Sequence, residues 1–342
     1  MIVRARAPLR LGFAGGGTDV PPYCDLHGGF VMNATIDKYA HATIDDASDG
    51  RVEFHVLDHG ESIAFDVGQV AQVEGKLTLL VGTYLRLIRD YRGGVQVPLR
   101  IRAYSDAPPG SGLGSSSTMV VALVTALAEY LSLGLGEYEI AHLAWDIERR
   151  DLALAGGKQD QYAAAFGGFN FMEFHRDDRV IVNPLRMKPW VVAELEASLV
   201  LYFTGISRAS AAIIDEQIRN VAAGDAHSID AMDRLKVEAV AMKEALLRGD
   251  LGSFVRTLQA GWEAKKQMAS SITNSTIDGV EQLAAQHGAL ATKVSGAGGG
   301  GFMMFFCHPH ERVGLMQALD GVGGRRMDFH FTLEGAVAWR PM

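Results

Sequence analysis

The chain has few cysteines and no long apolar run. Cys24 and Cys307 are the only cysteines among 342 residues, so a disulfide framework is excluded and a reducing compartment fits. The apolar run over 119–128, broken by Thr125, is too short to cross a bilayer. Residues 1–17 lack a sustained apolar core and make a poor signal peptide. We therefore expect a cytoplasmic protein that has no membrane partner.

Basic residues are also scarce relative to acidic ones. The 40 acidic and 32 basic side chains leave a net charge of -8, which disfavours a nucleic-acid partner because such a partner needs a basic face. A chain of 342 residues is long for one hydrophobic core, so two domains are expected. The composition shifts from strand patterns to long helical patterns near Pro184 and Pro189. We place the domains at 1–188 and 189–342.

Alternation and helical periodicity predict a mixed α+β chain. Strand patterns and helical patterns are interspersed up to residue 174, and helical patterns dominate after residue 209. The predicted strands are 2–13, 31–44, 52–56, 62–67, 97–103, 169–174, 199–204, 302–307, 327–331 and 336–339. The predicted helices are 77–91, 115–131, 137–151, 209–223, 228–247, 251–268, 276–287 and 312–319.

The segment 108–117, Pro-Pro-Gly-Ser-Gly-Leu-Gly-Ser-Ser-Ser, runs directly into a helical pattern and predicts a phosphate-binding loop. Its glycines let the backbone approach an anion, and the first amides of a helix have no partner within the helix. A turn with a helix cap would need only one glycine and one serine. The loop is not a Walker A motif, because no lysine follows its last glycine. Further glycine runs at 15–17 and 296–301 could converge with it on one cleft.

Two carboxylates follow this loop along the chain. Glu148 lies beside Ile147 near the edge of the buried face of the predicted helix 137–151. Asp160 follows Gly156 and Gly157, and a helix that restarts there would hold Asp160 in its first turn, where the helix dipole favours an ionised carboxylate. Such an aspartate can accept a proton from an attacking hydroxyl. A surface glutamate and a helix cap are the structural alternatives.

These residues together resemble the GHMP kinase family, which includes galactokinases and homoserine, mevalonate and phosphomevalonate kinases. The family's three motifs correspond to residues 7–19, 108–117 and 293–301, and so span nearly the whole chain. The resemblance implies two domains: an N-terminal one like ribosomal protein S5 domain 2 and a helix-rich α+β C-terminal one. It also implies that ATP and the substrate bind in the cleft between them.

The resemblance implies a role for each matching residue. Asp160 matches the catalytic aspartate, and Arg10 lies where the family has a basic residue near the reacting hydroxyl and the γ-phosphate. Glu148 matches a magnesium-ligating glutamate, and Ser116 the serine that completes the metal site, although neighbouring serines could replace it. The cofactors would be ATP and Mg²⁺. The residues expected around ATP are Pro109, Gly110, Ser111, Gly112, Leu113, Gly114, Ser115, Ser116 and Ser117.

The Gly-Gly-Gly-Thr-Asp form of residues 15–19, with 156–161 and 204–208, resembles the D-glycero-D-manno-heptose 7-phosphate kinases. These enzymes phosphorylate the C1 hydroxyl to give the 1,7-bisphosphate, in nucleotide-activated heptose synthesis for bacterial surface polysaccharide. A phosphorylated sugar needs cationic ligands, for which Lys158 and Arg208 are the candidates, with Arg149 and Arg150 behind them. The residues expected around the sugar phosphate are Gly16, Gly17, Thr18, Asp19, Lys158, Arg208, Gly298 and Gly299.

Other functions stay open at this point. L-fucose kinase domains share similar motifs, so an unphosphorylated sugar is the main alternative substrate. A non-enzymatic sugar or ATP sensor could use the same fold, but the presence of Asp160, Glu148 and Arg10 argues against it. The cluster 307–310, Cys-His-Pro-His, is expected to be a structural loop rather than a metal site. A homodimer is neither indicated nor excluded.

Overall fold

The first strand, β1 (Ile2–Ala14), changes its pattern of burial along its length. Its first half alternates between buried and exposed residues, as predicted, and its second half is buried on both faces. The reason is that Val3, Ala5 and Ala7 pack into one hydrophobic core, whereas Leu9 and Leu11 pack into a second. The computed structural model describes residues 1–342 except 48, 70–72, 109, 207–209 and 270.

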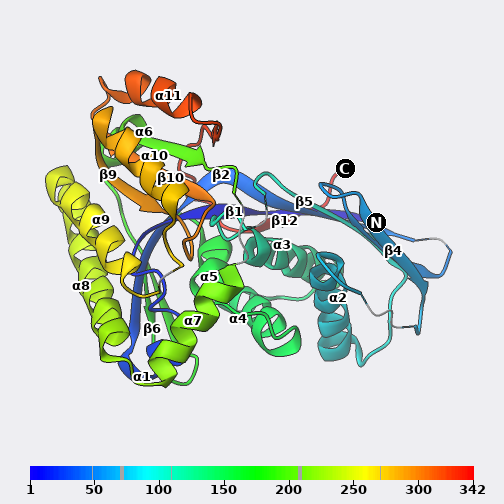
Figure 1. Cartoon of the computed structure of the whole chain (residues 1–342). Coiled ribbons are helices and arrows are strands. Elements are labelled where there is room, and N and C mark those ends of the chain that lie inside the picture. The colour runs from blue at the N-terminus through cyan, green and yellow to red at the C-terminus, as the bar shows by residue number, and fades with distance from the viewer. Residues whose placement is uncertain (48, 70–72, 109, 207–209, 270) are drawn as a thin grey trace.

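An extended sheet holds the first half of the chain together (Figure 1). The long strand β2 (Gly29–Asp46) pairs with β1, with β5 (Leu99–Ser105) near its end, and with β6 (Phe169–Phe174) near its beginning. The remaining strands of this sheet are β3 (Arg51–Val56), β4 (Glu61–Asp66), β7 (Val180–Pro184) and β12 (Val337–Trp339). All of its strand pairs are antiparallel except β3 with β5.

Helices cover one face of this sheet (Figure 1). The central helix α3 (Ser115–Tyr130) packs against β1 and β2 and is buried almost all round, which explains its nearly continuous apolar sequence. Its neighbours are α2 (Leu77–Arg92), α4 (Glu137–Asp146) and α5 (Gln159–Phe166), and the π-helical turn η1 (Ile147–Asp151) continues α4 and packs on α2. The short helix α1 (Tyr23–His27) precedes β2.

A smaller antiparallel sheet organises the second half, in the order β11 (Arg325–Arg326), β8 (Leu199–Phe203), β10 (Phe302–Cys307) and β9 (Ala289–Val294). Its strand β10 is wholly buried, as expected for a continuous apolar run between helices. The helices of this half are α6 (Pro189–Ser198), α7 (Ser210–Ala222), α8 (Ala226–Arg248), α9 (Leu251–Lys266), α10 (Ser275–Gln286) and α11 (Arg312–Asp320).

The chain returns to the first sheet at its end. Strand β12 pairs with β1, joining residues 337–339 to residues 4–6. The predicted division at residue 188 coincides with the start of α6 at Pro189, but the last strand lies with the first half. Residues 327–331 were predicted as a strand; this is wrong, because only Phe331 forms a bridge there, with Ile36.

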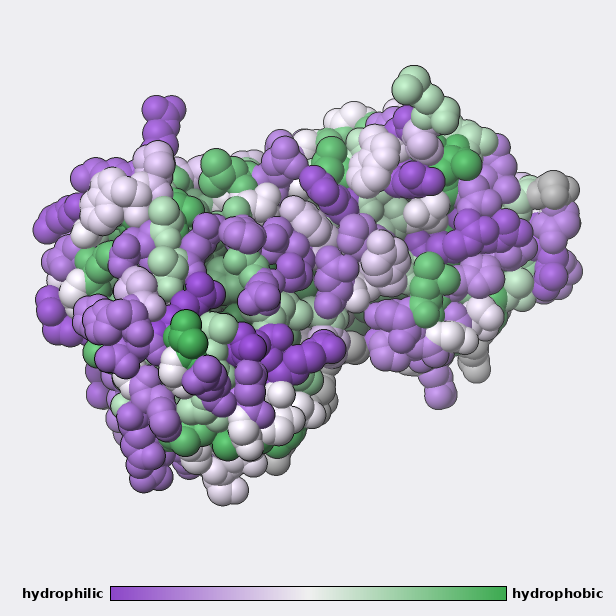
Figure 2. All heavy atoms as spheres, turned by 90° about the horizontal axis from the view of Figure 1, so that it is seen from above, coloured by the Kyte–Doolittle hydropathy of each residue, from purple (hydrophilic) through white to green (hydrophobic). Residues whose placement is uncertain are grey.

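Several elements differ from the sequence prediction. The predicted helix 137–151 is α-helical only to Asp146 and ends in a π-helical turn. The helices α1 and α6 and the strands β7 and β9 were not predicted. None of the helices in the described residues is long and apolar enough to span a membrane. Hydrophilic residues cover most of the face seen in Figure 2, with hydrophobic residues in small groups between them.

Candidate active site

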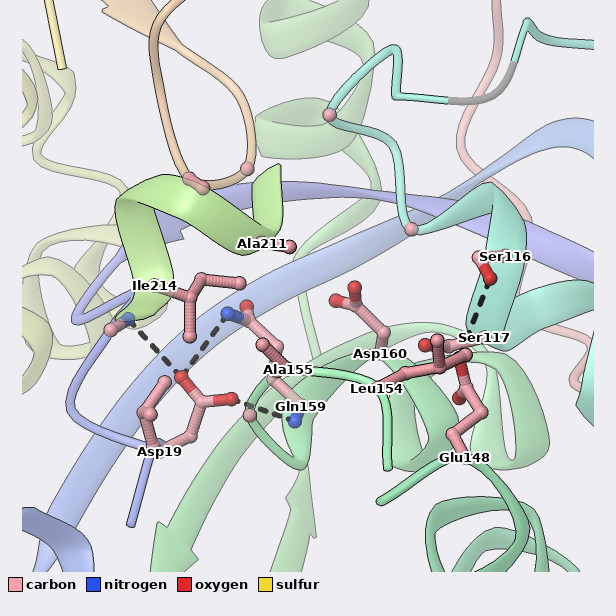
Figure 3. Close-up of a pocket in the computed structure, with 18 of the residues that line it drawn as sticks. Asp19, Ser116, Ser117, Glu148, Leu154, Ala155, Gln159, Asp160, Ala211 and Ile214 are labelled. Atoms are coloured by element: carbon pink, nitrogen blue, oxygen red, sulfur yellow. Dashed lines mark hydrogen bonds between the residues drawn. The ribbon is translucent and has the colours of Figure 1, made fainter. Parts of the chain in front are cut away.

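A cavity of about 270 Å³ lies where the two halves of the chain meet. The glycine runs predicted to converge do line it together: Gly17 from the first, Gly110, Gly112 and Gly114 from the second, and Gly296 from the third. Residues 154–157 and helices α5, α7 and α9 complete the wall, and Figure 3 shows several of these residues around the opening. The volume is near the lower end of that found in small-molecule sites.

The second and third glycine runs are in direct backbone contact. A Cβ atom on Gly112 would lie 2.2 Å from the carbonyl oxygen of Ser295, and one on Gly296 would lie 2.6 Å from the Cα atom of Gly112. Gly112 has φ +83° and Gly296 has φ +77°, so a side chain at either position would also strain the backbone. The amide of Phe302 donates to the carbonyl of Ser111 at 2.8 Å. These glycines therefore dock the two halves together beside the cavity.

Helix α3 begins at Ser115 as predicted, directly after Gly114. The first amides of a helix have no partner within it, and no side chain of the described residues caps them here. This helix start lies at the cavity, which Gly114 and Ser115 line. The serine hydroxyls contact other groups: Ser115 Oγ donates to the Pro108 carbonyl at 3.4 Å, and Ser117 Oγ accepts from Gln161 Nε2 at 3.0 Å. Free amides at a positive helix end make an anion site.

Asp160 and Arg10 form an ion pair on the cavity wall. Asp160 lies in the first turn of α5, as predicted, and its Oδ1 accepts from Arg10 Nε at 2.7 Å and lies 2.6 Å from Arg10 Nη2. Arg10 is almost fully buried, and Nη1 also donates to the Gly112 carbonyl at 2.5 Å. The side chain of Asp160 stays partly accessible, and a Cβ on Gly114 would lie 3.0 Å from its Cγ. The carboxylate thus faces the start of α3.

Glu148 is buried at the π-helical turn rather than on a helix surface. Its Oε2 accepts from Gln161 Nε2 at 2.5 Å, and its Oε1 accepts from Ser116 Oγ at 3.5 Å. The π-helical turn widens the helix at this point, a feature that often occurs at functional sites. Glu148, Ser116 and Ser117 therefore lie together on the side of the cavity below α3 (Figure 3).

Asp19 lies on the opposite side of the cavity, where it binds the start of α5 (Figure 3). Its Oδ2 accepts from the amides of Lys158 at 2.8 Å and Gln159 at 2.9 Å. Its Oδ1 accepts from Gln159 Nε2 at 3.2 Å and from the Gly17 amide at 3.1 Å. Burial raises the pKa of Asp19, and the nearby Asp160 carboxylate adds to the rise, while the Gln159 amide opposes it. Asp19 thereby positions the helix that carries Asp160.

The remaining predicted substrate residues differ in where they lie. Thr18 is buried, and its hydroxyl lies within hydrogen-bond distance of the backbone carbonyls of Gly15 at 2.8 Å and Phe30 at 2.9 Å. The ammonium of Lys158 is paired with Asp178 at 2.7 Å and packs over the Trp145 ring, so the structure does not bring it to the cavity. Its backbone amide, not its side chain, contributes to the site.

Further members of the predicted set fall outside the cavity or outside the described residues. Gly298 and Gly299 are not among the lining residues, and the Gly299 amide donates to the Ile272 carbonyl at 2.7 Å. A Cβ atom on Gly16 would lie 3.6 Å from Gln159 Nε2 and 3.9 Å from Lys265 Nζ. Pro109 and Arg208 lie outside the described residues.

The sequence analysis missed two groups of the site. Lys265, at the end of α9, and Gln159, beside Asp160, both line the cavity. Lys265 lies inside the predicted helix 251–268, and no neighbouring glycine or motif distinguishes it from a surface lysine. Gln159 directly precedes Asp160, so its place next to the predicted catalytic aspartate was a signal that could have identified it.

Two buried lysines, Lys265 and Lys293, should make the folding stability depend on pH. Burial lowers the pKa of Lys265 to about 7 and that of Lys293 to about 8, from an ordinary value of 10.5. At a pH between the lowered pKa and 10.5, each lysine binds a proton in the unfolded chain but not in the folded chain. The contribution of the two lysines to the free energy of unfolding therefore rises with pH in this range. We expect the melting temperature of the wild type to rise relative to that of Lys265→Met from pH 7 to pH 9. A difference independent of pH would contradict this.

Family models match both halves of the chain. The model of the GHMP kinases N terminal domain matches residues 78–168, and that of the GHMP kinases C terminal matches residues 242–319. The chain is 46% identical over 340 residues to the D-glycero-alpha-D-manno-heptose 7-phosphate kinase of Campylobacter jejuni, with 99% of both chains covered. It is 27% identical over 329 residues to the L-fucokinase/L-fucose-1-P guanylyltransferase of Bacteroides fragilis, covering 88% of this chain and 34% of that protein.

Solved structures share the fold. A crystal structure described as a D-glycero-D-manno-heptose 1-phosphate kinase from Bacteroides thetaiotaomicron has a TM-score of 0.84 and 45% identity, covering 99% of both chains. A galactokinase from Lactococcus lactis complexed with galactose has a TM-score of 0.76 at 18% identity, covering 98% of this chain and 95% of that one, which shows a common fold alone. The predicted two-domain α+β architecture is confirmed. The chain belongs to the GHMP kinase family.

Proposed function

We propose that this protein transfers the γ-phosphoryl group of ATP to the C1 hydroxyl of D-glycero-D-manno-heptose 7-phosphate, giving the 1,7-bisphosphate. The observation that carries the proposal is the place of Asp160: its carboxylate is held by Arg10 and faces the uncapped start of α3. Full-length identity of 46% to a Campylobacter jejuni enzyme of that name supports the choice of acceptor. The proposed reaction of this protein would be a step in the synthesis of nucleotide-activated heptose.

The triphosphate would lie along the second glycine run. The free amides at the start of α3 and the positive φ of Gly110, Gly112 and Gly114 let the backbone approach anionic oxygens closely. The acceptor sugar would occupy the cavity between Asp160 and the wall formed by Gly17 and Asp19. A nucleotide on one side of Asp160 and a sugar on the other would place the reacting oxygens in line.

The residues Ser116 and Glu148 fit a magnesium ion. A hydroxyl and a carboxylate are oxygen ligands of the kind Mg²⁺ prefers, and neighbouring ligands of an octahedral Mg²⁺ lie about 3 Å apart. The distance of 3.5 Å between Ser116 Oγ and Glu148 Oε1 is close to that value. When bound, the ion would neutralise charge on the phosphate oxygens. Phosphate oxygens and water would fill its other positions, because no group of three or more His, Cys, Asp or Glu side chains suited to a metal occurs in the described residues.

The residues of the chain then have separate tasks in the transfer. The C1 oxygen forms a bond to the γ-phosphorus while the bond from that phosphorus to the leaving ADP oxygen breaks. Asp160 Oδ2 accepts the hydroxyl proton, and an anomeric hydroxyl is acidic enough that a strong base is not needed. The Arg10 guanidinium keeps the Asp160 carboxylate in place and stabilises the charge of the transferring group.

A panel of acceptors tests this function. We expect turnover with heptose 7-phosphate to exceed that with the unphosphorylated heptose, L-fucose, galactose or mevalonate by about 100-fold or more in kcat/KM, because a site that hydrogen-bonds a group of its substrate rejects analogues that lack that group. Phosphorus NMR of the product should show the new phosphate at C1. Preference for L-fucose or another unphosphorylated sugar would support the alternative kinase, and absence of turnover with every acceptor would support a sensor.

A further inference from the structure

Lys265 joins the walls of the cavity that come from opposite ends of the chain. It lies in the last turn of helix α9 in the second half of the molecule, is only 3% exposed and lines the cavity. Its ammonium donates to the carbonyl of Gly296 in the third glycine run. A Cβ atom on Gly16 in the first run would lie 3.9 Å from Lys265 Nζ. Lys265 thus reaches the region where the three glycine runs meet.

The other cations that line the cavity each have a carboxylate within ion-pair distance. Arg10 is paired with Asp160, and Arg149 lies 3.7 Å from Glu148 and donates to the Leu154 carbonyl at 3.2 Å. Among the cavity-lining residues that the structure describes, Lys265 is the cation without a carboxylate within ion-pair distance. An ammonium has three donors, and the described hydrogen bonds use one of them.

The charges around Lys265 come from both halves of the chain. Asp19 and Asp160 favour its charged form, whereas Arg10 and Lys293 oppose it. Burial is the largest effect, and it lowers the pKa of Lys265 to about 7. A buried cation that lacks an anionic partner is unfavourable unless a ligand supplies one. The ammonium is close enough to Asp160 and Arg10 to be influenced by both, so the expected anion belongs to the reacting groups.

We propose that Lys265 is a catalytic residue whose ammonium binds an oxygen of the phosphoryl group during its transfer and shares that charge with Arg10. This inference rests on the proposed function, because it requires phosphoryl transfer beside Asp160. The contact with Gly296 places the ammonium next to the third glycine run, which is itself packed on Gly112 of the predicted triphosphate loop. Lys265 would thus bring the second half of the chain into the chemistry.

The test compares Lys265→Met with Lys266→Met. The adjacent Lys266 is paired with Glu263 at 2.8 Å and does not line the cavity, so it is a matched control. We expect Lys265→Met to lower kcat about 100-fold or more, with the KM for the acceptor and the Kd of a non-hydrolysable ATP analogue changed less than about threefold. Lys266→Met should match the wild type. A kcat of Lys265→Met within about threefold of the wild type would overturn the inference.

A second variant separates charge from packing. In Lys265→Cys, treatment with 2-bromoethylamine forms a carbon–sulfur bond with loss of bromide and restores an ammonium at nearly the original position. A thiol at position 265 would open onto the cavity, whereas Cys24 and Cys307 are buried and do not line it, so these two should react more slowly. We expect kcat to recover at least about tenfold over the untreated variant. No recovery after complete modification, confirmed by mass spectrometry, would contradict the inference.

The acceptor used keeps the two proposals apart. Wild-type turnover of heptose 7-phosphate is measured first, and its absence would count against the proposed function alone. The Lys265 variants would then be compared with the acceptor that the wild type does phosphorylate, or in the transfer of the γ-phosphoryl group to water. A variant that loses only affinity for phosphorylated acceptors, with kcat intact, would show that Lys265 binds the sugar's own phosphate and would refute the role proposed here.

Discussion

The variant Asp160→Asn is expected to lower kcat by about 1,000-fold or more, because an amide cannot accept the proton of the acceptor hydroxyl. The amide keeps the shape of the carboxylate, and Asp160 contacts Arg10 rather than the amides at the start of α3. The Kd of a non-hydrolysable ATP analogue should therefore change less than about threefold. Steady-state kinetic assays measure kcat, and calorimetric titration with the ATP analogue measures its Kd separately.

An exposed aspartate on α8, Asp230, supplies the matched control, and Asp230→Asn should keep full activity. A second arm uses Arg10→Met. Because Arg10 and Asp160 act as a unit, adding Arg10→Met to Asp160→Asn should lower kcat by much less than Arg10→Met does in the wild type. Wild-type kcat in Asp160→Asn would show that the proton acceptor is another group.

Glu148→Gln has the second large expected effect. The loss of a charged oxygen ligand should lower kcat/KM about 100-fold at low magnesium, and a higher magnesium concentration should recover part of that loss. Glu148 is buried and accepts from Gln161, so the melting temperature must be measured alongside activity to separate folding from metal binding.

Glu137→Gln, in the exposed first turn of α4, is the control for removing a glutamate charge. It should leave both activity and magnesium dependence unchanged. If Glu148→Gln showed the wild-type dependence of kcat/KM on magnesium concentration, Glu148 would not be a metal ligand, and its contacts with Gln161 and Ser116 would be structural only.

Local sequence was enough to predict most of the elements and part of the site. The glycines of 110–114 and the apolar spacing after Ser115 predict a loop that enters a helix, because both signals act over a few residues. Local patterns also identified the two carboxylates. Glu148 lies near the end of the predicted helix 137–151, and Asp160 follows the glycine pair at 156–157. A strand over 336–339 was predicted and is confirmed by β12, but its pairing with β1 was not evident locally, and neither was the π-helical turn after α4.

The sequence could not predict which way the charged side chains of the site point. Lys158 is two residues from Asp160 but turns away to Asp178, whereas Lys265 is more than 100 residues from Asp160 and lines the same cavity. Asp19 was expected to bind sugar, and its carboxylate accepts four hydrogen bonds from residues 17, 158 and 159.

The sequence by itself determined the glycine-rich backbone, the helix that starts at Ser115 and the kinds of side chain available for phosphoryl transfer. These depend on backbone freedom and on periodic burial, which neighbouring residues specify. Only the tertiary structure decided which charges meet, because long side chains choose partners by distance in space and by burial. The pair of Arg10 with Asp160, and the ammonium of Lys265 with no carboxylate partner among the described residues, exist only once β1, α5 and α9 are packed around one cavity.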